Sequence, residues 1–264
     1  MQEILSAVWL GLVEGITEFL PISSTGHLIL AADALRFTGP EAKTFEVVVQ
    51  FAAILAVIHL YRRRFLGLLR PVPGARFSGP YGLWLLFLTT LPAGFLGLIA
   101  HSQIKEHLFA PAPVALALGV GALGLLLVEY AQPAVRARTL DDLGWRIALG
   151  VGLFQCLALW PGFSRAAATI MGAMFLGAER KLAAEYSFLA AVPIITAASG
   201  FDLLASWKHL SGSDLLVLAT GCLVSFASAW LVVKGFLHLL NHFTLKPFAY
   251  YRFGVVFVYL LLWT

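Results

Sequence analysis

The chain has 264 residues, of which 60% are hydrophobic and only 12% are charged, and its mean hydropathy is +0.87. A soluble domain carries about a quarter of charged residues, so this composition excludes a water-soluble globular protein and predicts apolar surface that faces lipid. The net charge of +4 does not indicate a nucleic-acid-binding protein, because the basic residues cluster in short loops between apolar runs. Near the N-terminus stands Glu3 without a basic stretch, so we expect no cleaved signal peptide.

The first apolar region, 4–35, is not a simple membrane span. It contains Glu14 and Glu18 and is then interrupted by the sequence PISSTG at 21–26. Each half is too short to cross a hydrocarbon layer of roughly 30 Å as a helix. We therefore expect a re-entrant hairpin, whose non-helical turn is tolerated at membrane depth only where protein covers it or water reaches it.

Six further apolar stretches are long enough, or nearly so, to cross the membrane as helices. A second broken region, 146–178, is interrupted at 161–165 by PGFSR and predicts a second re-entrant hairpin. The fold class predicted is an all-α integral membrane protein with six transmembrane helices and two re-entrant helical hairpins. The six spans are expected at about 45–61, 82–100, 113–131, 183–205, 214–236 and 248–264.

The two broken regions resemble each other, which predicts two inverted repeats within a single membrane domain, 1–264. GLVEGITEFLPISS at 11–24 and GLFQCLALWPGFS at 152–164 both begin with Gly-Leu and end near Pro and Ser. Because an odd number of spans separates the hairpins, they enter from opposite faces and can meet near the midplane. The repeats are expected to cover about 1–131 and 132–264.

The basic residues predict the orientation of the chain. If the first hairpin opens outward, the cytoplasmic loops 62–81, 132–147, 177–182 and 238–247 carry eleven Lys and Arg residues. The opposite loops carry four, namely Arg36, Lys43, Lys105 and Lys208. The positive-inside rule therefore places both termini outside.

Glu14 and Glu18 are the first candidate site residues. Their spacing of four puts both carboxylates on one face of a helix. Two neighbouring anions in a low dielectric need a cation or a shared proton, so a divalent metal ion is one resolution and a proton held between them is another. A purely structural role, in which the two glutamates reach the membrane interface or cap a helix end, is the alternative. It is less favoured because a polar turn follows them directly.

That turn supplies hydroxyls, a glycine and a histidine ahead of a new helix: Ser23, Ser24, Thr25, Gly26 and His27. Hydroxyls and backbone N–H groups at a helix start suit phosphate oxygens. Ser and Thr in this position are also ordinary N-caps, so for Ser23 alone capping and anion binding remain equally open.

Arg165 follows the second break, and its planar fork suits bidentate binding of phosphate. An ion pair with Glu14 or Glu18, or placement at a headgroup, is compatible with the same position. Ser164 and Thr169 can bond the same anion or cap the following helix. Gln50, in the middle of a span, can line the cavity or bond another helix.

At these residues the chain closely resembles the undecaprenyl-diphosphate phosphatases, also called bacitracin-resistance proteins. The matching motifs are EGITEFLPISSTGH at 14–27 and WPGFSR at 160–165 with Thr169. Similarity extends through AKTFEVVVQ, FQCLALW, EYSFLAAVP and PFAYYRF, so it runs nearly end to end. One departure is that the family commonly has Ser-Gly after the motif arginine, whereas Ala166 and Ala167 stand here.

The resemblance implies a multi-pass enzyme of the bacterial inner membrane that removes the terminal phosphate of C55 isoprenyl diphosphate. It also implies a site facing the periplasm, inverted repeats and a homodimer. The physiological role implied is recycling of the lipid carrier for peptidoglycan, with links to cell-wall biogenesis, cell shape and bacitracin resistance.

The residues and the resemblance together predict a mechanism. Ser24 is expected as nucleophile, activated by Glu18 directly or through His27, with His27 itself as the alternative nucleophile. The phosphate is expected to contact Arg165 and the polar groups around both breaks, which are Ser23, Thr25, Gly26, Ser164, Thr169 and Gln50. Glu14 and Glu18 are expected to hold Mg²⁺ or Ca²⁺. The rival function is a lipid-phosphate flippase, which needs a binding site but no nucleophile.

Overall fold

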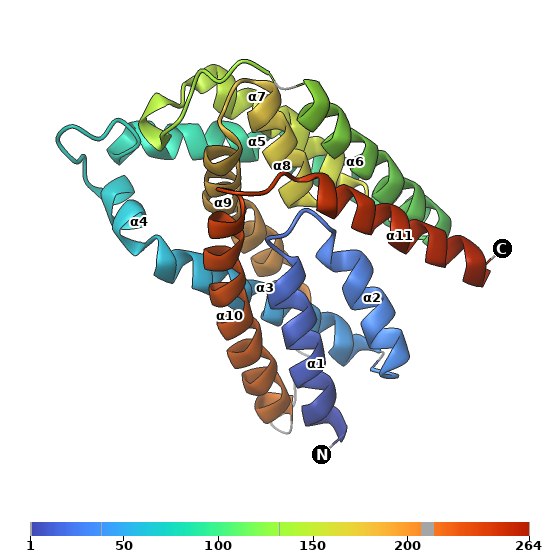
Figure 1. Ribbon diagram of the computed structural model, residues 1–264. Helices are drawn as coiled ribbons and strands as arrows, with labels where there is room; N and C mark the ends of the chain where they lie inside the picture. The colour runs from blue at the N-terminus through green and yellow to red at the C-terminus, as the bar shows by residue number, and fades with distance from the viewer. Residues whose placement is uncertain (1, 38, 132, 207–213, 264) are drawn as a thin grey trace.

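The computed structural model of the protein describes residues 2–37, 39–131, 133–206 and 214–263, and the regular elements in these ranges are helices (Figure 1). The only extended pairing within them is an isolated bridge between Ala137 and Ala178. The all-α prediction is therefore confirmed. The helices are α1 (Gln2–Thr17), α2 (Ser24–Ala34), α3 (Pro40–Leu60), α4 (Arg62–Leu69), α5 (Gly79–His107), α6 (Pro111–Ala131), α7 (Trp145–Gln155), α8 (Arg165–Phe175), α9 (Arg180–Ser206), α10 (Asp214–Leu239) and α11 (Lys246–Trp263), with short 3-10 helices η1 (Leu140–Asp142) and η2 (Cys156–Leu159).

Four helices, α5, α6, α9 and α10, are long and apolar enough to cross a membrane, and α3 with α4 forms a fifth candidate that is bent by 80°. α3, α5, α6, α9 and α10 overlap five of the predicted spans, whereas α11, at the position of the sixth, is not among these candidates. The sequence predicts a loop at 62–81, but the first residues of this segment form α4. Gly67 and Leu68 of this short helix are buried, and that packing holds together a helix that begins with three arginines.

Large apolar side chains on the outside of these helices support a membrane location. Leu98 on α5 exposes 73% of its surface and Leu223 on α10 exposes 71%. Neighbouring positions on α5, α6 and α10 are similarly exposed. An apolar surface spread over several helices is suited to hydrocarbon and not to water.

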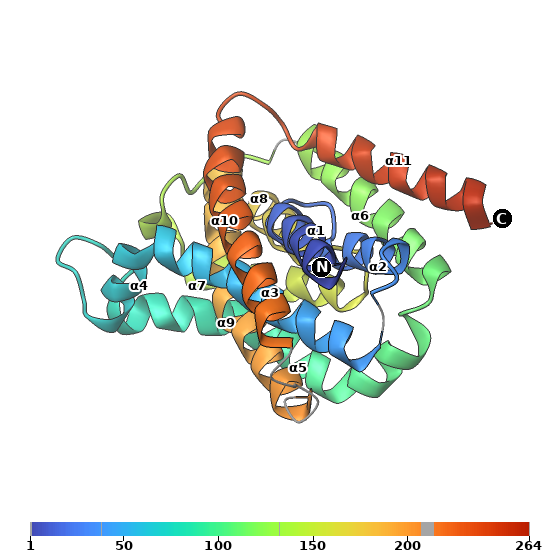
Figure 2. The ribbon, with the colours of Figure 1, turned by 90° about the horizontal axis from the view of Figure 1, so that it is seen from below.

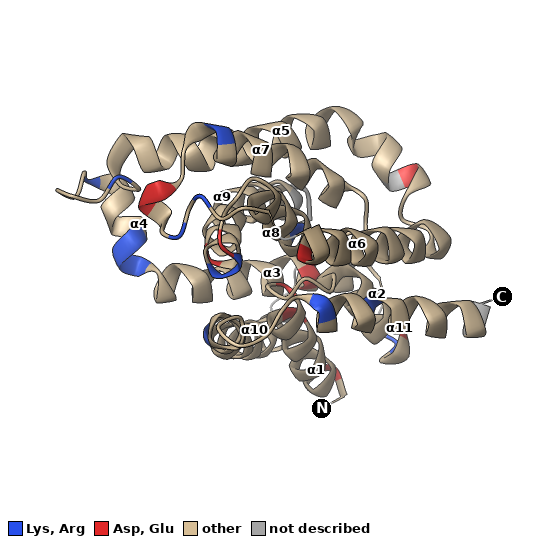
Figure 3. Cartoon of the chain, turned by 45° about the horizontal axis from the view of Figure 1, so that its top comes forward, with Lys and Arg blue, Asp and Glu red and all other residues tan. Residues whose placement is uncertain are grey.

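The distribution of charged residues also fits a membrane location (Figure 3). Lys and Arg mark α4 and the start of α9, whereas long stretches of α5, α6 and α10 carry neither. Among the residues used to predict orientation, Lys208 lies outside the described part of the chain.

The helices of the two halves pack in matching pairs. α1 packs mainly on α10 and α7 on α5, while α3 packs on α9 and α6 on α11. Figures 1 and 2 show α6 and α11 side by side from two directions. Two glycines permit the matching close approaches: a Cβ on Gly11 would lie 2.6 Å from the carbonyl oxygen of Gly221, and one on Gly152 would lie 2.7 Å from that of Leu88.

The two broken regions contain short helices and breaks, but the first break lies three residues earlier than the predicted 21–26, so that Ser24, Thr25 and Gly26 are helical. α1 and α2 are separated at 18–23, and η2 and α8 are separated at 160–164. The residue before each second helix has the same unusual backbone, with φ 74° and ψ 95° at Ser23 and φ 75° and ψ 118° at Ser164. A positive φ is uncommon outside glycine and costs conformational energy, so both turns must be held by their surroundings.

Arg252 on α11 holds the two breaks together. Its side chain is fully buried and donates to the carbonyl oxygens of Pro21 at 3.2 Å and Gly162 at 3.0 Å. It also donates to the carbonyls of Leu118 and Ala117 on α6. One guanidinium thus joins both turns to α6.

Candidate active site

Ser24 and Glu18 form the centre of the candidate site. Ser24 is the first residue of α2, and Glu18 follows the last residue of α1. The Ser24 hydroxyl donates to Glu18 Oε2 at 2.5 Å, and both residues are buried. A short bond from a hydroxyl to a carboxylate is the arrangement that a general base needs to activate a serine nucleophile.

Arg165 reaches the same carboxylate from the second break. As the first residue of α8, it donates from Nη2 to Glu18 Oε1 at 2.9 Å. Nη1 donates to the backbone oxygen of Ser187 at 3.1 Å and to its hydroxyl at 3.3 Å. Within the described part of the chain, Arg165 Nε is buried and has no hydrogen-bond partner. The structure therefore brings Glu18, Ser24 and Arg165 together, and the ion pair that the sequence allowed is present.

Glu14 lies one turn before Glu18 and is fully buried. In the described structure neither of its carboxylate oxygens has a hydrogen-bond partner. A buried carboxylate that lies against the Glu18 carboxylate fits a divalent cation bound through oxygen ligands, or a proton shared by the two groups. No group of three or more His, Cys, Asp or Glu residues suited to a metal occurs among the described residues. Two carboxylates with water or phosphate oxygens would therefore complete the ligand set, as Mg²⁺ commonly accepts.

The turn before α2 places its other polar residues differently. Ser23 is buried, but its hydroxyl makes no capping bond to α2. Of the two roles left open for Ser23, N-capping is therefore not present in the described structure. Thr25 is exposed and Gly26 is buried in the first turn of α2. His27 is half-buried and bonds the Ser23 carbonyl oxygen through Nδ1 at 2.8 Å and the Tyr251 hydroxyl through Nε2 at 2.6 Å.

The remaining predicted residues support Arg165 or lie elsewhere. Ser164 caps α8, accepting from the backbone N–H of Ala167 at 3.2 Å. Thr169 is fully buried, donates to the backbone oxygen of Arg165 at 2.9 Å, and shares a hydrogen bond of 2.7 Å with the Ser187 hydroxyl. Gln50 is half-buried on α3. Binding of phosphate by these three residues stays a prediction.

Sequence reasoning missed three residues that the structure places next to the site: Ser187, Tyr251 and Arg252. All three lie in segments quoted for the resemblance, but no role was assigned to them. Arg252 could have been found, because an arginine within an apolar span calls for the same explanation as Arg165. Ser187 gives no such signal, because a serine in a membrane helix commonly bonds its own backbone.

Ser187→Ala is expected to lower kcat for the reaction at this site about tenfold. The substitution removes one of the two acceptors that hold Arg165 Nη1 and the partner of Thr169, and a hydrogen bond to a charged group contributes about 1.5–3 kcal/mol. The measurement is steady-state kinetics on purified protein. Ser199→Ala is the matched control, because Ser199 lies on the same helix with a buried hydroxyl that has no described partner. Activity of Ser187→Ala within twofold of that control would contradict the positioning role.

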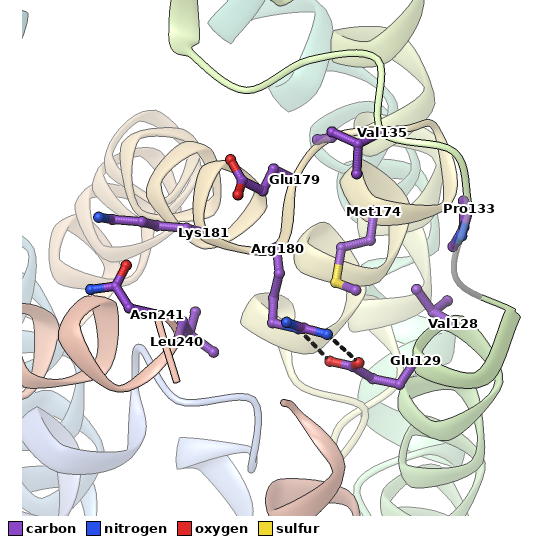
Figure 4. Close-up of a pocket in the computed structure, with 11 residues that line it drawn as sticks. Val128, Glu129, Pro133, Val135, Met174, Glu179, Arg180, Lys181, Leu240 and Asn241 are labelled. Atoms are coloured by element: carbon purple, nitrogen blue, oxygen red, sulfur yellow. Dashed lines mark hydrogen bonds and ion pairs between the residues drawn. The ribbon is translucent and has the colours of Figure 1, made fainter. Parts of the chain in front are cut away.

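A cavity of about 420 Å³ lies apart from these residues (Figure 4). None of the predicted site residues lines it. At its wall Arg180 makes a bidentate pair with Glu129, at 2.7 and 2.6 Å, and Glu129 also accepts from the backbone N–H of Leu245. These contacts join α6 to α9 and to the segment before α11, and we interpret them as a structural tie. The lining residues are Val128, Glu129, Pro133, Val135, Met174, Ala178, Glu179, Arg180, Lys181, Leu240 and Asn241.

The chain is similar over nearly its whole length to one protein family and to several proteins that share a name. The family described as "Bacitracin resistance protein BacA" matches residues 7–258. The chain is 58% identical over 264 residues, covering 100% of both chains, to a protein of Maridesulfovibrio salexigens named undecaprenyl-diphosphatase. It is 60% identical over 255 residues, covering 97% of this chain and 96% of the relative, to one of that name from Nitratidesulfovibrio vulgaris. Undecaprenyl-diphosphatase 1 of Bacillus anthracis is 47% identical over 252 residues, covering 96% and 95%.

Proposed function

Since this chain belongs to the bacitracin resistance protein BacA family, we propose that the site around Ser24 carries out the reaction for which its relatives are named. The chain is a membrane phosphatase that hydrolyses undecaprenyl diphosphate to undecaprenyl phosphate and inorganic phosphate. The observation that carries the proposal is the hydrogen bond of 2.5 Å from the Ser24 hydroxyl to Glu18. A flippase has no use for an activated hydroxyl, and the relatives are named for phosphatase activity.

In the first step Ser24 Oγ attacks the terminal phosphorus, and its proton passes to Glu18. The bond from this phosphorus to the bridging oxygen breaks, and undecaprenyl phosphate leaves with the electron pair. Water then attacks the phosphoserine, Glu18 returns the proton to Ser24 Oγ, and inorganic phosphate leaves with both hydrogens of the water. Attack by His27 is the alternative, but both of its ring nitrogens bond other groups in this structure.

Charge on the transferring phosphoryl group has to be neutralised from the protein side. Arg165 can release its hydrogen bond to Glu18 and donate to the phosphate instead. Its buried Nε, which has no partner in the described structure, is a further donor. The start of α2 supplies backbone N–H groups, with Thr25 and Gly26 in its first turn. Glu14 and Glu18 would hold Mg²⁺ or Ca²⁺, which would supply positive charge to the diphosphate oxygens.

The arrangement in the membrane is also part of the proposal. We propose six spans, with α1–α2 and α7–α8 as re-entrant hairpins of two inverted repeats. The matching helix pairs, the shared backbone of Ser23 and Ser164, and the positions of Gly11 and Gly152 support this interpretation. The excess of Lys and Arg in the predicted cytoplasmic loops supports an active site that faces the periplasm across the bacterial inner membrane. Recycling of the peptidoglycan lipid carrier and bacitracin resistance follow from the activity, and a homodimer rests on the family resemblance alone.

Release of inorganic phosphate from a prenyl diphosphate by the purified protein in detergent tests the function. We expect release that falls at least about 100-fold in EDTA and returns with Mg²⁺ or Ca²⁺, because the charge of the metal stabilises the transition state by several kcal/mol. A mock purification from cells that do not express this chain controls for contaminating phosphatases. Absence of release above that control would reject the enzyme in favour of the flippase. Release that EDTA leaves unchanged would reject the cation.

A further inference from the structure

His27 lies three residues after Ser24, yet its ring is occupied by groups other than Ser24 and Glu18. Nδ1 bonds the Ser23 carbonyl oxygen at 2.8 Å, and since a carbonyl can only accept, Nδ1 carries the proton. Nε2 shares a hydrogen bond of 2.6 Å with the Tyr251 hydroxyl, and the two rings stack with their centroids 5.6 Å apart. The imidazole is thus held at both nitrogens.

The Ser23 carbonyl depends on this ring. The backbone bond that should open α2, from His27 N–H to the Ser23 oxygen, is 3.5 Å long. At the matching place in the second half, Ala168 N–H reaches the Ser164 oxygen at 3.0 Å, and the Ser164 hydroxyl caps the helix. Ser23 makes no capping bond of that kind. The first turn therefore has a longer backbone bond than the second turn and no side-chain cap, and the imidazole supplies the missing support.

We propose that His27 and Tyr251 are positioning residues that brace the Ser23 turn, and through it the nucleophile Ser24, without transferring protons. The turn needs a brace because Ser23 is held at φ 74°. Tyr251 and Arg252 are consecutive on α11, and they contact this turn at two points: Arg252 bonds the Pro21 carbonyl, and Tyr251 reaches the Ser23 carbonyl through His27. α11 thereby fixes the direction of the Ser24 hydroxyl.

Substitutions at His27 separate bracing from proton transfer, given that the proposed function of Ser24 holds. The amide nitrogen of Asn lies where Nδ1 of histidine lies, so His27→Asn keeps the donor to the Ser23 carbonyl but cannot take a proton. Gln places its amide nitrogen at Nε2, so His27→Gln loses that donor. We expect kcat of His27→Asn to stay within about fivefold of wild type, and His27→Gln and His27→Ala to lose about 100-fold, with KM unchanged in all three.

Tyr251→Phe tests the hydrogen bond between Tyr251 and His27 Nε2. It keeps the stacked ring and removes only the hydroxyl, so we expect kcat to fall about fivefold with KM unchanged. Tyr250→Phe, which removes the hydroxyl of the adjacent and exposed Tyr250, is the matched control and should behave as wild type. In the double variant His27→Ala with Tyr251→Phe, we expect no loss beyond that of His27→Ala, because Tyr251 acts only through His27.

The outcomes are distinguishable. If His27→Asn is as inactive as His27→Ala while Ser24→Ala is also inactive, the brace is wrong and His27 takes part in the chemistry. If Tyr251→Phe matches the Tyr250→Phe control, or its loss adds to that of His27→Ala, Tyr251 does not act through His27. Activity of Ser24→Ala in the same assay would instead overturn the proposed function.

Discussion

Ser24→Ala is expected to lower kcat for phosphate release by at least about 10³-fold. Removing a nucleophile abolishes the covalent route and leaves only binding and electrostatic catalysis. Ser24 is small and its side chain bonds Glu18, so the substitution deletes one oxygen without opening a large cavity. KM should change little, because the phosphate ligands remain in place.

The control is Ser102→Ala, the same deletion at an exposed position near the end of α5, and it should retain full activity. Both variants should elute as wild type on size exclusion and melt within a few degrees of it. Acid-quenched turnover with a terminally labelled substrate should leave phosphate on Ser24. Label on His27, or Ser24→Ala retaining a tenth of wild-type activity, would contradict the assignment.

Much of the fold could be predicted because the bilayer fixes it. An apolar stretch of membrane length becomes a helix, since every backbone polar group in hydrocarbon must be satisfied internally. The breaks could be located because Pro21 and Pro161 stand within otherwise apolar regions that contain charges. The α4 helix could not, because three consecutive arginines at 62–64 look like an ordinary charged loop, and the burial of Gly67 and Leu68 depends on the tertiary fold.

The centre of the site could be predicted for the same physical reason, while its supports could not. Glu18 and Arg165 are charges inside apolar segments, and such charges need partners. That they partner each other depends on how the second half folds against the first, which no local pattern records. Ser187 and Tyr251 act through single hydroxyls, and their sequence neighbourhoods give no hint of the residues they contact.

The structure explains why Ala166 and Ala167 can replace the Ser-Gly that the family commonly has after the motif arginine. Ala166 and Ala167 are both fully buried, and the Ala167 backbone N–H donates to the Ser164 hydroxyl. A serine hydroxyl at 166 would need a buried partner, whereas the alanine methyl packs in the core. The capping bond that begins α8 uses only the backbone at 167, so Arg165 is positioned without a hydroxyl from either residue.

Arg165→Lys is expected to lower kcat by about 100-fold to 1,000-fold although the positive charge is kept. The guanidinium spans two partners, with one nitrogen on Glu18 and the other on Ser187, and a single ammonium cannot occupy both directions. Lysine would also lack the planar fork for a phosphate in the transition state, so the loss should lie in kcat more than in KM. Steady-state kinetics with a prenyl diphosphate measures both.

Arg180→Lys is the matched control, because Arg180 is the other arginine in a described ion pair and likewise uses two nitrogens, in its case on Glu129. There the substitution should lower the melting temperature in detergent while leaving kcat per folded protein within about twofold of wild type, since the pair ties helices together away from Ser24. An equal loss of kcat in the two variants would mean that any disturbed guanidinium pair inactivates this fold. Near wild-type kcat in Arg165→Lys would mean that charge alone is sufficient, and the contacts of two separate guanidinium nitrogens with Glu18 and Ser187 would then have no part in the reaction.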